Sequence, residues 1–292
     1  MIDLLPGFTS VPTDVEGLTV HAVTAGEGPP VLLLHGYPQT HVMWHRVAPA
    51  LAASRTVVLA DLRGYGDSAK PADAGYDKRA MADDLVGLMR ALGHERFAVV
   101  GHDRGGRVAH RLALDHPQSV SALAVLDIVA TLHMFEHVDL SMATSYFHWF
   151  FLTQGSGLPE RLIGADPQAW LDSRFAGRHA GGRGLDAMAL AEYARCFDLD
   201  TIAASCADYR AAAGVDLEHD RADRAAGRVI TAPTLALWGT ASYVGRNFDV
   251  LASWAPFAPG TQGHGIHADH YLAEEAPEDV LAALRPFLAA AQ

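Results

Sequence analysis

The sequence predicts an α/β protein with a mostly parallel central sheet, helices on both faces of that sheet and an inserted helical cap. Short apolar runs alternate with longer amphipathic stretches through the first 127 residues, which is the βαβ rhythm of a parallel sheet. The run Phe97 to Val100 is wholly apolar, as is typical of a central strand buried on both faces. From about residue 130 to 225 the rhythm changes to Met-, aromatic- and Ala-rich segments without a clear strand.

The individual elements follow from apolar spacing and from the glycines and prolines that bound each run. The strands predicted in the first half are Leu18 to Val23, Pro30 to Leu34, Arg55 to Ala60, Phe97 to Val100 and Ser121 to Leu126. Helices are predicted over Arg79 to Leu92, ending near Gly93, and over Arg107 to Asp115. Later in the chain we expect a strand at Thr234 to Trp238, a final helix in Pro277 to Ala290 and a loop at Ala180 to Gly184.

The same change of rhythm predicts how the chain is divided. Residues 1–129 and 226–292 should form two parts of one α/β core, and residues 130–225 should form the helical cap between them. The chain has 292 residues, half of them hydrophobic, so it can bury a core of this size.

Composition excludes several classes of partner. The formal charge of −12 and the pI near 5.7 disfavour nucleic acid and anionic membranes, because the long-range field repels both. There is no basic segment followed by a long apolar run at the start of the sequence, and no run of 18 apolar residues elsewhere. We therefore expect a soluble, cytoplasmic protein. Cys196 and Cys206 stand in no metal or redox spacing and are expected to be free thiols.

Metal binding has little support in the spacing of the histidines. The 16 histidines are scattered, and only His264, His267 and His270 recur every three residues. They would converge on a metal only in a helix, and Gly263 and Gly265 disfavour a helix there. No metal or cofactor is expected.

A sharp strand-to-helix turn is predicted at Gly101-His102-Asp103-Arg104-Gly105-Gly106. It matches the pattern in which small residues flank a nucleophile held clear of the sheet, with aspartate in place of serine. A carboxylate that attacks an sp³ carbon gives a stable ester, whereas attack on an acyl carbon gives an anhydride. The predicted reaction is displacement followed by ester hydrolysis. The alternative is that Asp103 only caps its helix.

Hydrolysis of such an ester requires a base and an acid that orients it. His270 is the candidate base, because it follows the last strand region and precedes the final helices. His264 and His267 remain competitors. Asp127, at the end of the strand after Asp103, is the candidate orienting acid, since Gly239 to Asn247 contains no carboxylate.

Six motifs of the chain can be compared with known families: His35-Gly36-Tyr37-Pro38-Gln39-Thr40, Asp61 to Ser68, Gly101 to Arg107, His148-Trp149, Cys206 to Ala211 and Asp216-Leu217-Glu218-His219-Asp220. Together they resemble the fluoroacetate dehalogenases, a family with the α/β-hydrolase fold. The first two motifs also suit epoxide hydrolases and haloalkane dehalogenases. The resemblance runs from about residue 5 to the end. Haloalkane dehalogenases typically carry tryptophan directly after the nucleophile, where this chain has Arg104.

The resemblance implies specific roles and a small haloacid substrate. It assigns the nucleophile to Asp103, the triad partners to Asp127 and His270, and the substrate carboxylate to Arg104 and Arg107, a pairing that guanidinium geometry suits. The halide pocket would be His148, Trp149 and Tyr209, and the oxyanion would be bound by the backbone N–H groups of Tyr37 and Arg104. The family also implies a homodimer without a cofactor.

Some of these residues also have a simpler structural explanation. Arg107 would then form an ion pair on the surface of its helix, and His148-Trp149 would pack in the core as part of an aromatic run. Asp269 departs from the family, which usually has glycine before the catalytic histidine, and an added carboxylate there could alter His270.

Two rival functions remain. An epoxide hydrolase would share the aspartate nucleophile and recruit Tyr146 and Tyr209 as acids. A non-catalytic ligand receptor would use the same fold, although a receptor would be free to lose a triad member and this chain retains a full set.

Overall fold

The computed structural model describes residues 4–72, 75–175 and 184–290. Its centre is an eight-stranded sheet in the order β1-β4-β6-β5-β7-β8-β9-β10, with β2 and β3 forming a separate antiparallel pair. The sheet strands are β1 (Thr9–Ser10), β4 (Ala22–Ala25), β5 (Val31–Leu34), β6 (Val57–Ala60), β7 (Phe97–His102), β8 (Val120–Leu126), β9 (Thr234–Gly239) and β10 (Gln262–Ile266). The pair is β2 (Thr13–Val15) and β3 (Leu18–Val20).

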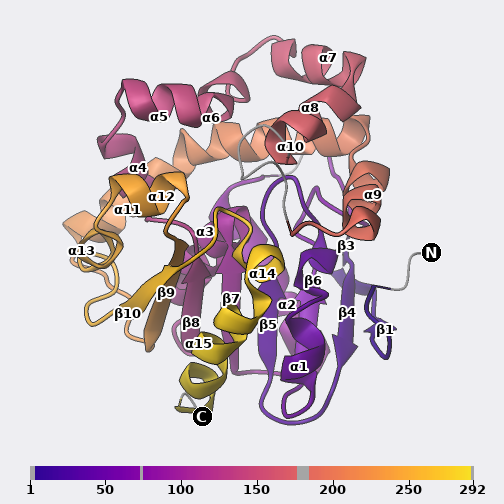
Figure 1. Ribbon diagram of the computed structural model, residues 1–292, viewed down its shortest axis with the longest axis vertical. Coiled ribbons are helices and arrows are strands. Elements are labelled where there is room, and N and C mark those ends of the chain that lie inside the picture. Colours follow the sequence, from indigo (N-terminus) through magenta and orange to yellow (C-terminus); the bar gives the residue numbers. More distant parts are fainter. Residues whose placement is uncertain (1–3, 73–74, 176–183, 291–292) are drawn as a thin grey trace.

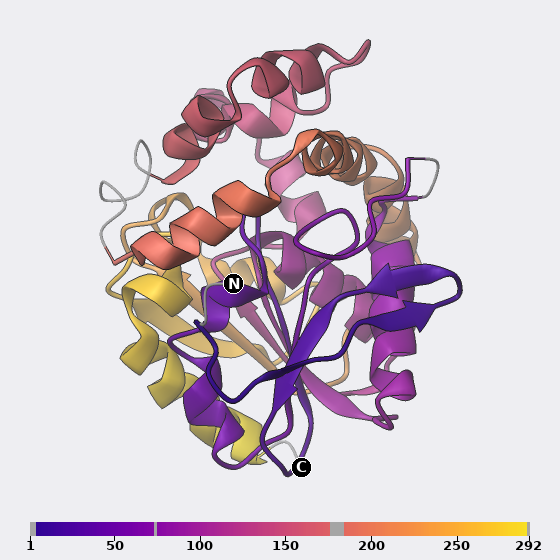
Figure 2. The same ribbon diagram turned by 90° about the vertical axis from the view of Figure 1, so that its right-hand side faces the viewer.

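Every pairing from β6 to β10 is parallel, while β1, β4 and β6 pair antiparallel at one edge. All residues of β5, β6 and β7 are buried, because helices cover both faces of the sheet. The covering helices are η1 (His41–Trp44), α1 (Ala48–Ala52), α2 (Lys78–Ala91), α3 (Asp103–Asp115), α12 (Tyr243–Asn247), α13 (Val250–Trp254), α14 (Leu272–Glu275) and α15 (Pro277–Ala290). Figure 2 shows α2 and α3 on one side of the sheet and α1 and α15 on the other.

A layer of helices lies over one end of the strands (Figure 1). It consists of α4 (Thr131–Glu136), α5 (Leu140–Ser145), α6 (Phe147–Phe151), α7 (Leu158–Ala165), α8 (Pro167–Phe175), α9 (Ala187–Cys196), α10 (Leu199–Ala212) and α11 (Val215–Ala225). In the described part of this stretch, between β8 and β9, there is no strand. The loop predicted at Ala180 to Gly184 lies outside the described residues except for Gly184.

The elements predicted from the sequence are found, with three corrections. The strand predicted at Leu18 to Val23 is wrong as a single element: β3 ends at Val20 and β4 begins at Ala22, because His21 lies between them with its backbone N–H bonded to Ser68 Oγ. The helix predicted from Arg107 begins four residues earlier, at Asp103. The glycine-rich stretch from 262 to 266, for which no element was named, forms the edge strand β10.

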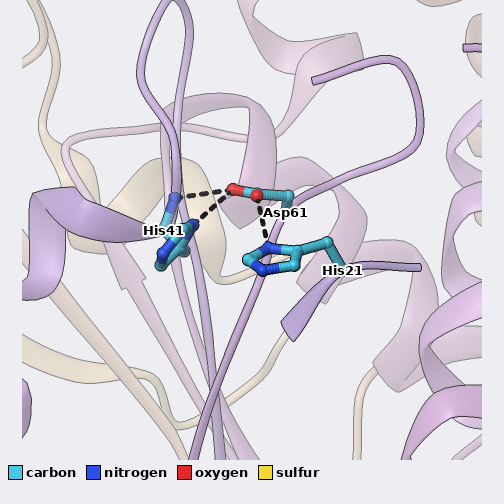
Figure 3. A group of neighbouring side chains, drawn as sticks. All are labelled: His21, His41 and Asp61. Carbon is cyan, nitrogen blue, oxygen red and sulfur yellow. Dashed lines mark hydrogen bonds and ion pairs between the residues drawn. The ribbon is translucent and has the colours of Figure 1, made fainter. Parts of the chain in front are cut away.

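The loop after β5 is fixed by the buried carboxylate of Asp61, which follows β6. Asp61 Oδ1 accepts hydrogen bonds from the backbone N–H (2.8 Å) and Nδ1 (3.0 Å) of His41, and Oδ2 accepts from His21 Nδ1 (2.9 Å) and Asp67 N (3.1 Å). Figure 3 shows both imidazoles directed at the carboxylate. Burial alone would raise the pKa of Asp61, but His41 and His21 hold it well below its usual range. The Asp61 carboxylate thus connects the segments around His21, His41 and Asp67 through hydrogen bonds.

Within the described residues, none of the helices has both the length and the apolar character needed to span a membrane.

Candidate active site

Asp103 stands at the sharp turn between β7 and α3. Its φ is +44°, in the left-handed region, and close packing around the turn requires glycine on either side. A Cβ on Gly101 would lie 2.4 Å from the carbonyl oxygen of Gly105, and a Cβ on Gly105 would lie 2.4 Å from that of His35. The Asp103 side chain does not cap its own helix: Oδ2 accepts a hydrogen bond from the backbone N–H of Tyr37 (3.1 Å). The capping alternative is therefore wrong.

Asp127 and His270 form a hydrogen-bonded pair next to this turn. His270 Nδ1 lies 2.7 Å from Asp127 Oδ2, while Asp127 Oδ1 accepts from Ser242 Oγ (2.6 Å) and from Gly239 N (3.0 Å). Burial raises the pKa of Asp127, and the hydrogen bonds from His270, Ser242 and Gly239 oppose that rise. The contact between Nδ1 and Asp127 fixes the orientation of the His270 ring.

A small cavity of about 20 Å³ brings the carboxylate and the imidazole together. Seven residues line it: Tyr37, Asp103, Tyr146, His148, Arg174, His270 and Tyr271. Burial by itself would raise the pKa of Asp103, but the nearby charges of His270, His102, Arg107 and Arg104 lower it below its ordinary value. The carboxylate is thus kept ionised, as a nucleophile must be.

The two competing histidines do not reach this cavity. His264 lies in β10 and His267 just after it, and both are exposed, whereas His270 is buried. Among the three, His270 is the one that lines the cavity at Asp103.

Arg104 is held by Asp208 of α10. Its Nε donates to Asp208 Oδ2 (2.9 Å), and its Nη2 donates to the Asp208 carbonyl oxygen (3.1 Å) and to Oδ1. The remaining nitrogen, Nη1, is buried and has no hydrogen-bond partner among the described residues. Two of three nitrogens are thus occupied, so the guanidinium fork expected for a substrate carboxylate is reduced to one available donor nitrogen.

Arg107 is also buried, which rules out the surface ion pair. Its Nη1 donates to Val129 O (3.1 Å) and Thr131 Oγ1 (3.0 Å), and its guanidinium carbon lies 4.5 Å from the centre of the Trp149 ring. Its Nε has no hydrogen-bond partner in the described part of the chain. Burial lowers the pKa of Arg107, and Asp103 opposes this, so the two groups act on each other electrostatically.

The three residues proposed for a halide lie together, with the Tyr209 ring in contact with the other two. The Tyr209 ring is 5.7 Å from that of His148, 6.2 Å from that of Trp149 and 5.4 Å from that of Tyr37, centre to centre. Among described residues, neither the buried Trp149 Nε1 nor the buried Tyr209 hydroxyl has a hydrogen-bond partner. Unpaired buried donors are costly, and an acceptor bound beside them would remove that cost.

Arg174, Ser242 and Asp208 were given no role in the site from the sequence. Arg174 of α8 lines the cavity, with its guanidinium 4.7 Å and 4.8 Å from the rings of Phe147 and Trp170. Ser242 holds Asp127, and Asp208 holds Arg104. Each acts through a contact between segments far apart in the chain, and a pattern of spacings does not contain such contacts.

A larger cavity of about 480 Å³ shares no lining residue with the one at Asp103, although neighbouring residues of the chain line the two. It is lined mostly by α5, α12 and neighbouring residues, and Asp269 belongs to it. Although it is more spacious, it contains neither Asp103 nor His270. The extra carboxylate of Asp269 therefore faces a different space from its neighbour His270.

Glu274 links the segment after His270 to the helical layer. Its Oε2 accepts a hydrogen bond from Gln39 Nε2 (2.5 Å), and its Oε1 accepts from the hydroxyl of Tyr193 in α9 (3.0 Å). Glu274 is fully buried, and burial raises its pKa to about 8.

This raised pKa predicts a stability that falls with pH. The folded chain keeps a proton on Glu274 that the unfolded chain releases above the ordinary value of 4.5. The free energy of unfolding should therefore fall as pH rises from 4.5 to about 8, by up to about 5 kcal/mol. Glu274→Gln should flatten this dependence in urea unfolding at the two ends of the window. Glu278→Gln, at an exposed position of α15, is the control. An unchanged slope in Glu274→Gln would contradict the prediction.

Comparison with known proteins agrees with this architecture. The sequence model of the alpha/beta hydrolase fold family matches residues 29–277. A fluoroacetate dehalogenase from Burkholderia sp is 45% identical over 99% of this chain and 96% of its own length. A soluble epoxide hydrolase from Corynebacterium sp. (strain C12) is 34% identical over 94% and 95%. A solved protein from Nostoc sp PCC 7120, assigned to the alpha/beta hydrolases, has 50% identity and a TM-score of 0.94, covering 96% of this chain and 98% of its own.

The parallel sheet, the sharp turn after β7 and the family match over residues 29–277 define an alpha/beta hydrolase. The high identity to the Burkholderia protein extends over nearly both full chains. The chain belongs to the fluoroacetate dehalogenase family of these hydrolases.

Proposed function

We propose that the protein hydrolyses a small 2-haloacid such as fluoroacetate to glycolate and halide through an ester on Asp103. The observation that carries this proposal is the cavity in which the ionised Asp103 faces His270, next to buried guanidinium groups. The 45% identity to a fluoroacetate dehalogenase supports the same substrate class.

In the first step, the substrate carboxylate binds Arg104 Nη1 and Arg107. Asp103 attacks the α-carbon, forming a carbon–oxygen bond while the carbon–halogen bond breaks and its electron pair leaves with the halide. His148, Trp149 and Tyr209 donate hydrogen bonds to the departing halide. The buried, unpaired Trp149 Nε1 and Tyr209 hydroxyl favour this role, since preorganised donors stabilise charge as it develops.

In the second step, His270, oriented by Asp127, takes a proton from water, and the water oxygen attacks the carboxyl carbon of the Asp103 ester. The backbone N–H groups of Tyr37 and Arg104 stabilise the tetrahedral oxyanion. The hydrogen bond from Tyr37 N to Asp103 Oδ2 (3.1 Å) supports this role for Tyr37. Collapse of the intermediate expels glycolate, whose alkoxide oxygen takes the proton back from His270, and loss of the remaining carboxyl proton to solvent restores the Asp103 carboxylate.

The proposal includes the organisation of the chain. Residues 130–225 act as a cap that closes the substrate site, while residues 1–129 and 226–292 form the core. The family resemblance favours a homodimer in the cytoplasm, with no metal or cofactor taking part in the reaction. Light scattering of the purified chain tests the dimer.

An epoxide hydrolase is the second candidate, and relatives bearing that name are among the matches. It would use Tyr146 and Tyr209 to protonate the opening epoxide oxygen. Tyr146 lines the cavity, but the buried arginines around Asp103 favour an anionic substrate over a neutral epoxide.

One experiment separates the two functions. The purified chain is incubated separately with fluoroacetate, chloroacetate and a styrene-type epoxide, and halide release and diol formation are measured. We expect halide release from the haloacetates and little diol. Diol formation without halide release would overturn the proposal in favour of the epoxide hydrolase.

A further inference from the structure

The carboxylate of Asp208, in α10 of the helical layer, is buried among donors from three parts of the chain that surround the sheet. Its Oδ2 accepts from the Tyr65 hydroxyl (2.7 Å) and from Arg104 Nε (2.9 Å), and its Oδ1 accepts from Lys78 Nζ and Arg104 Nη2. Tyr65 follows β6, Lys78 begins α2, and Arg104 lies in the first turn of α3. Each carboxylate oxygen thus has two donors, which fix the side chain in one orientation.

The charges around Asp208 keep it ionised. Burial alone would raise the pKa of Asp208, but Arg104 and Lys78 hold it well below its usual range. Lys78 is only 3% exposed, and its ammonium also lies 3.6 Å from Asp216 Oδ2. Well-packed apolar residues often replace a buried ion pair without loss of stability. Stability therefore does not explain this cluster by itself, and its effect on the orientation of Arg104 becomes important.

Asp208 and its neighbour Tyr209 hold the guanidinium of Arg104 from two directions. Asp208 occupies the edge formed by Nε and Nη2, and the centre of the Tyr209 ring lies 4.1 Å from the guanidinium carbon. A guanidinium is planar, and its donors have fixed directions relative to one another. The contacts at this edge and this face therefore also set the direction of Nη1, the nitrogen that has no hydrogen-bond partner among the described residues.

We propose that Asp208 is a positioning residue for the substrate carboxylate, because it directs Arg104 Nη1, while Lys78 and Tyr65 hold Asp208 in place. The inference rests on the proposed function, in which Arg104 Nη1 binds the haloacid. The substrate carboxylate keeps its charge while the halide is displaced, so its hydrogen bond to Arg104 stabilises the bound substrate and the transition state alike. Loss of such an interaction raises KM and leaves kcat largely unchanged.

Another buried ion pair joins α3 to the helical layer and supplies a matched control. Arg111 of α3 donates to Asp220 Oδ1 (2.6 Å) and to Asp223 Oδ2 (2.5 Å), both in α11. These side chains are buried, like Asp208 and Arg104, but they have no part in the proposed reaction. If Asp208 only fastened the helical layer to the core, Asp220→Asn should have the same consequences as Asp208→Asn.

The test compares the full chain with Asp208→Asn, Lys78→Met, Tyr65→Phe and the control Asp220→Asn. Asp208→Asn replaces one acceptor oxygen with an amide N–H group, and Tyr65→Phe removes one hydrogen bond without changing a charge. Fluoride release from fluoroacetate gives kcat and KM. Calorimetry gives the dissociation constant of acetate, which has the carboxylate but no leaving group. Melting curves show which variants fold, and if Asp208→Asn does not, Lys78→Met and Tyr65→Phe decide the question.

We expect Asp208→Asn to raise both KM for fluoroacetate and the dissociation constant of acetate about 10–100-fold, the range of a hydrogen bond to a charged group. Its kcat should change less than about threefold, as for an interaction made equally in both states. Lys78→Met and Tyr65→Phe should raise both constants to a smaller extent, and Asp220→Asn should leave them unchanged.

Three results would overturn the inference: unchanged constants in the folded variants at Asp208, Lys78 and Tyr65, an equal loss in Asp220→Asn, or no acetate binding by the unchanged chain. Acetate binding does not depend on turnover, so it decides the inference even if the unchanged chain releases no halide. That last result would count against the proposed function instead.

Discussion

Asp103→Asn should lose at least about four orders of magnitude in kcat for halide release from fluoroacetate, the scale on which triad members are lost in hydrolases. An amide is a poor nucleophile and cannot form the ester. Asparagine tolerates left-handed backbone, such as the φ of +44° at this position. The change therefore removes the nucleophile with little disturbance of the turn, and the loss is to be measured by ion chromatography of released fluoride.

The control is Asp83→Asn, an exposed carboxylate on α2 that pairs with His116, which should turn over normally. Melting curves of both variants should match that of the unchanged chain to within a few degrees. Sustained multiple turnovers by a folded Asp103→Asn chain would show that another group attacks the substrate.

The second large effect is expected for His270→Asn, which should react with one molecule of substrate and then stop turning over. Asp103 would still displace the halide, because attack needs only the ionised carboxylate. Water would no longer be deprotonated, so the ester should accumulate. Intact-protein mass spectrometry after fluoroacetate addition should show one added carboxymethyl group, and peptide mapping should place it on Asp103.

A double variant, Asp103→Asn with His270→Asn, should show no added mass under the same conditions. His267→Asn, at an exposed histidine three residues away, should turn over without accumulating an adduct. If His270→Asn reacts slowly but never carries an adduct, the two-step route is wrong.

Much of the fold could be predicted from local spacing. The buried strands β5 to β9 are short apolar runs, and burial on both faces of a parallel sheet imposes that composition. The break at His21 could not be predicted in this way, because it depends on bonds to Ser68 and Asp61 from a later part of the chain. The edge strand β10 has two glycines and alternates exposed and half-buried residues, so it lacks the apolar signal of its neighbours.

The same distinction holds for the candidate site. Asp103 could be predicted from the sequence because the turn requires Gly101 and Gly105. The hydrogen bonds that occupy Arg104 could not be predicted, because only the packing of α10 brings Asp208 against it. For the same reason Arg174 reaches the cavity without any signal in its own segment.

Asp103 and Asp127 both have left-handed backbone, with φ of +44° and +52°. Non-glycine residues held in that region cost about 1–3 kcal/mol each, so the molecule gives up stability at the two positions on which its proposed reaction depends. Glycine at either position would relieve that conformational penalty while removing a reacting or orienting carboxylate. Selection for heat resistance alone should therefore favour glycine at these two positions and give inactive variants. Selection for turnover should keep both aspartates, and stabilising substitutions should then arise at other positions.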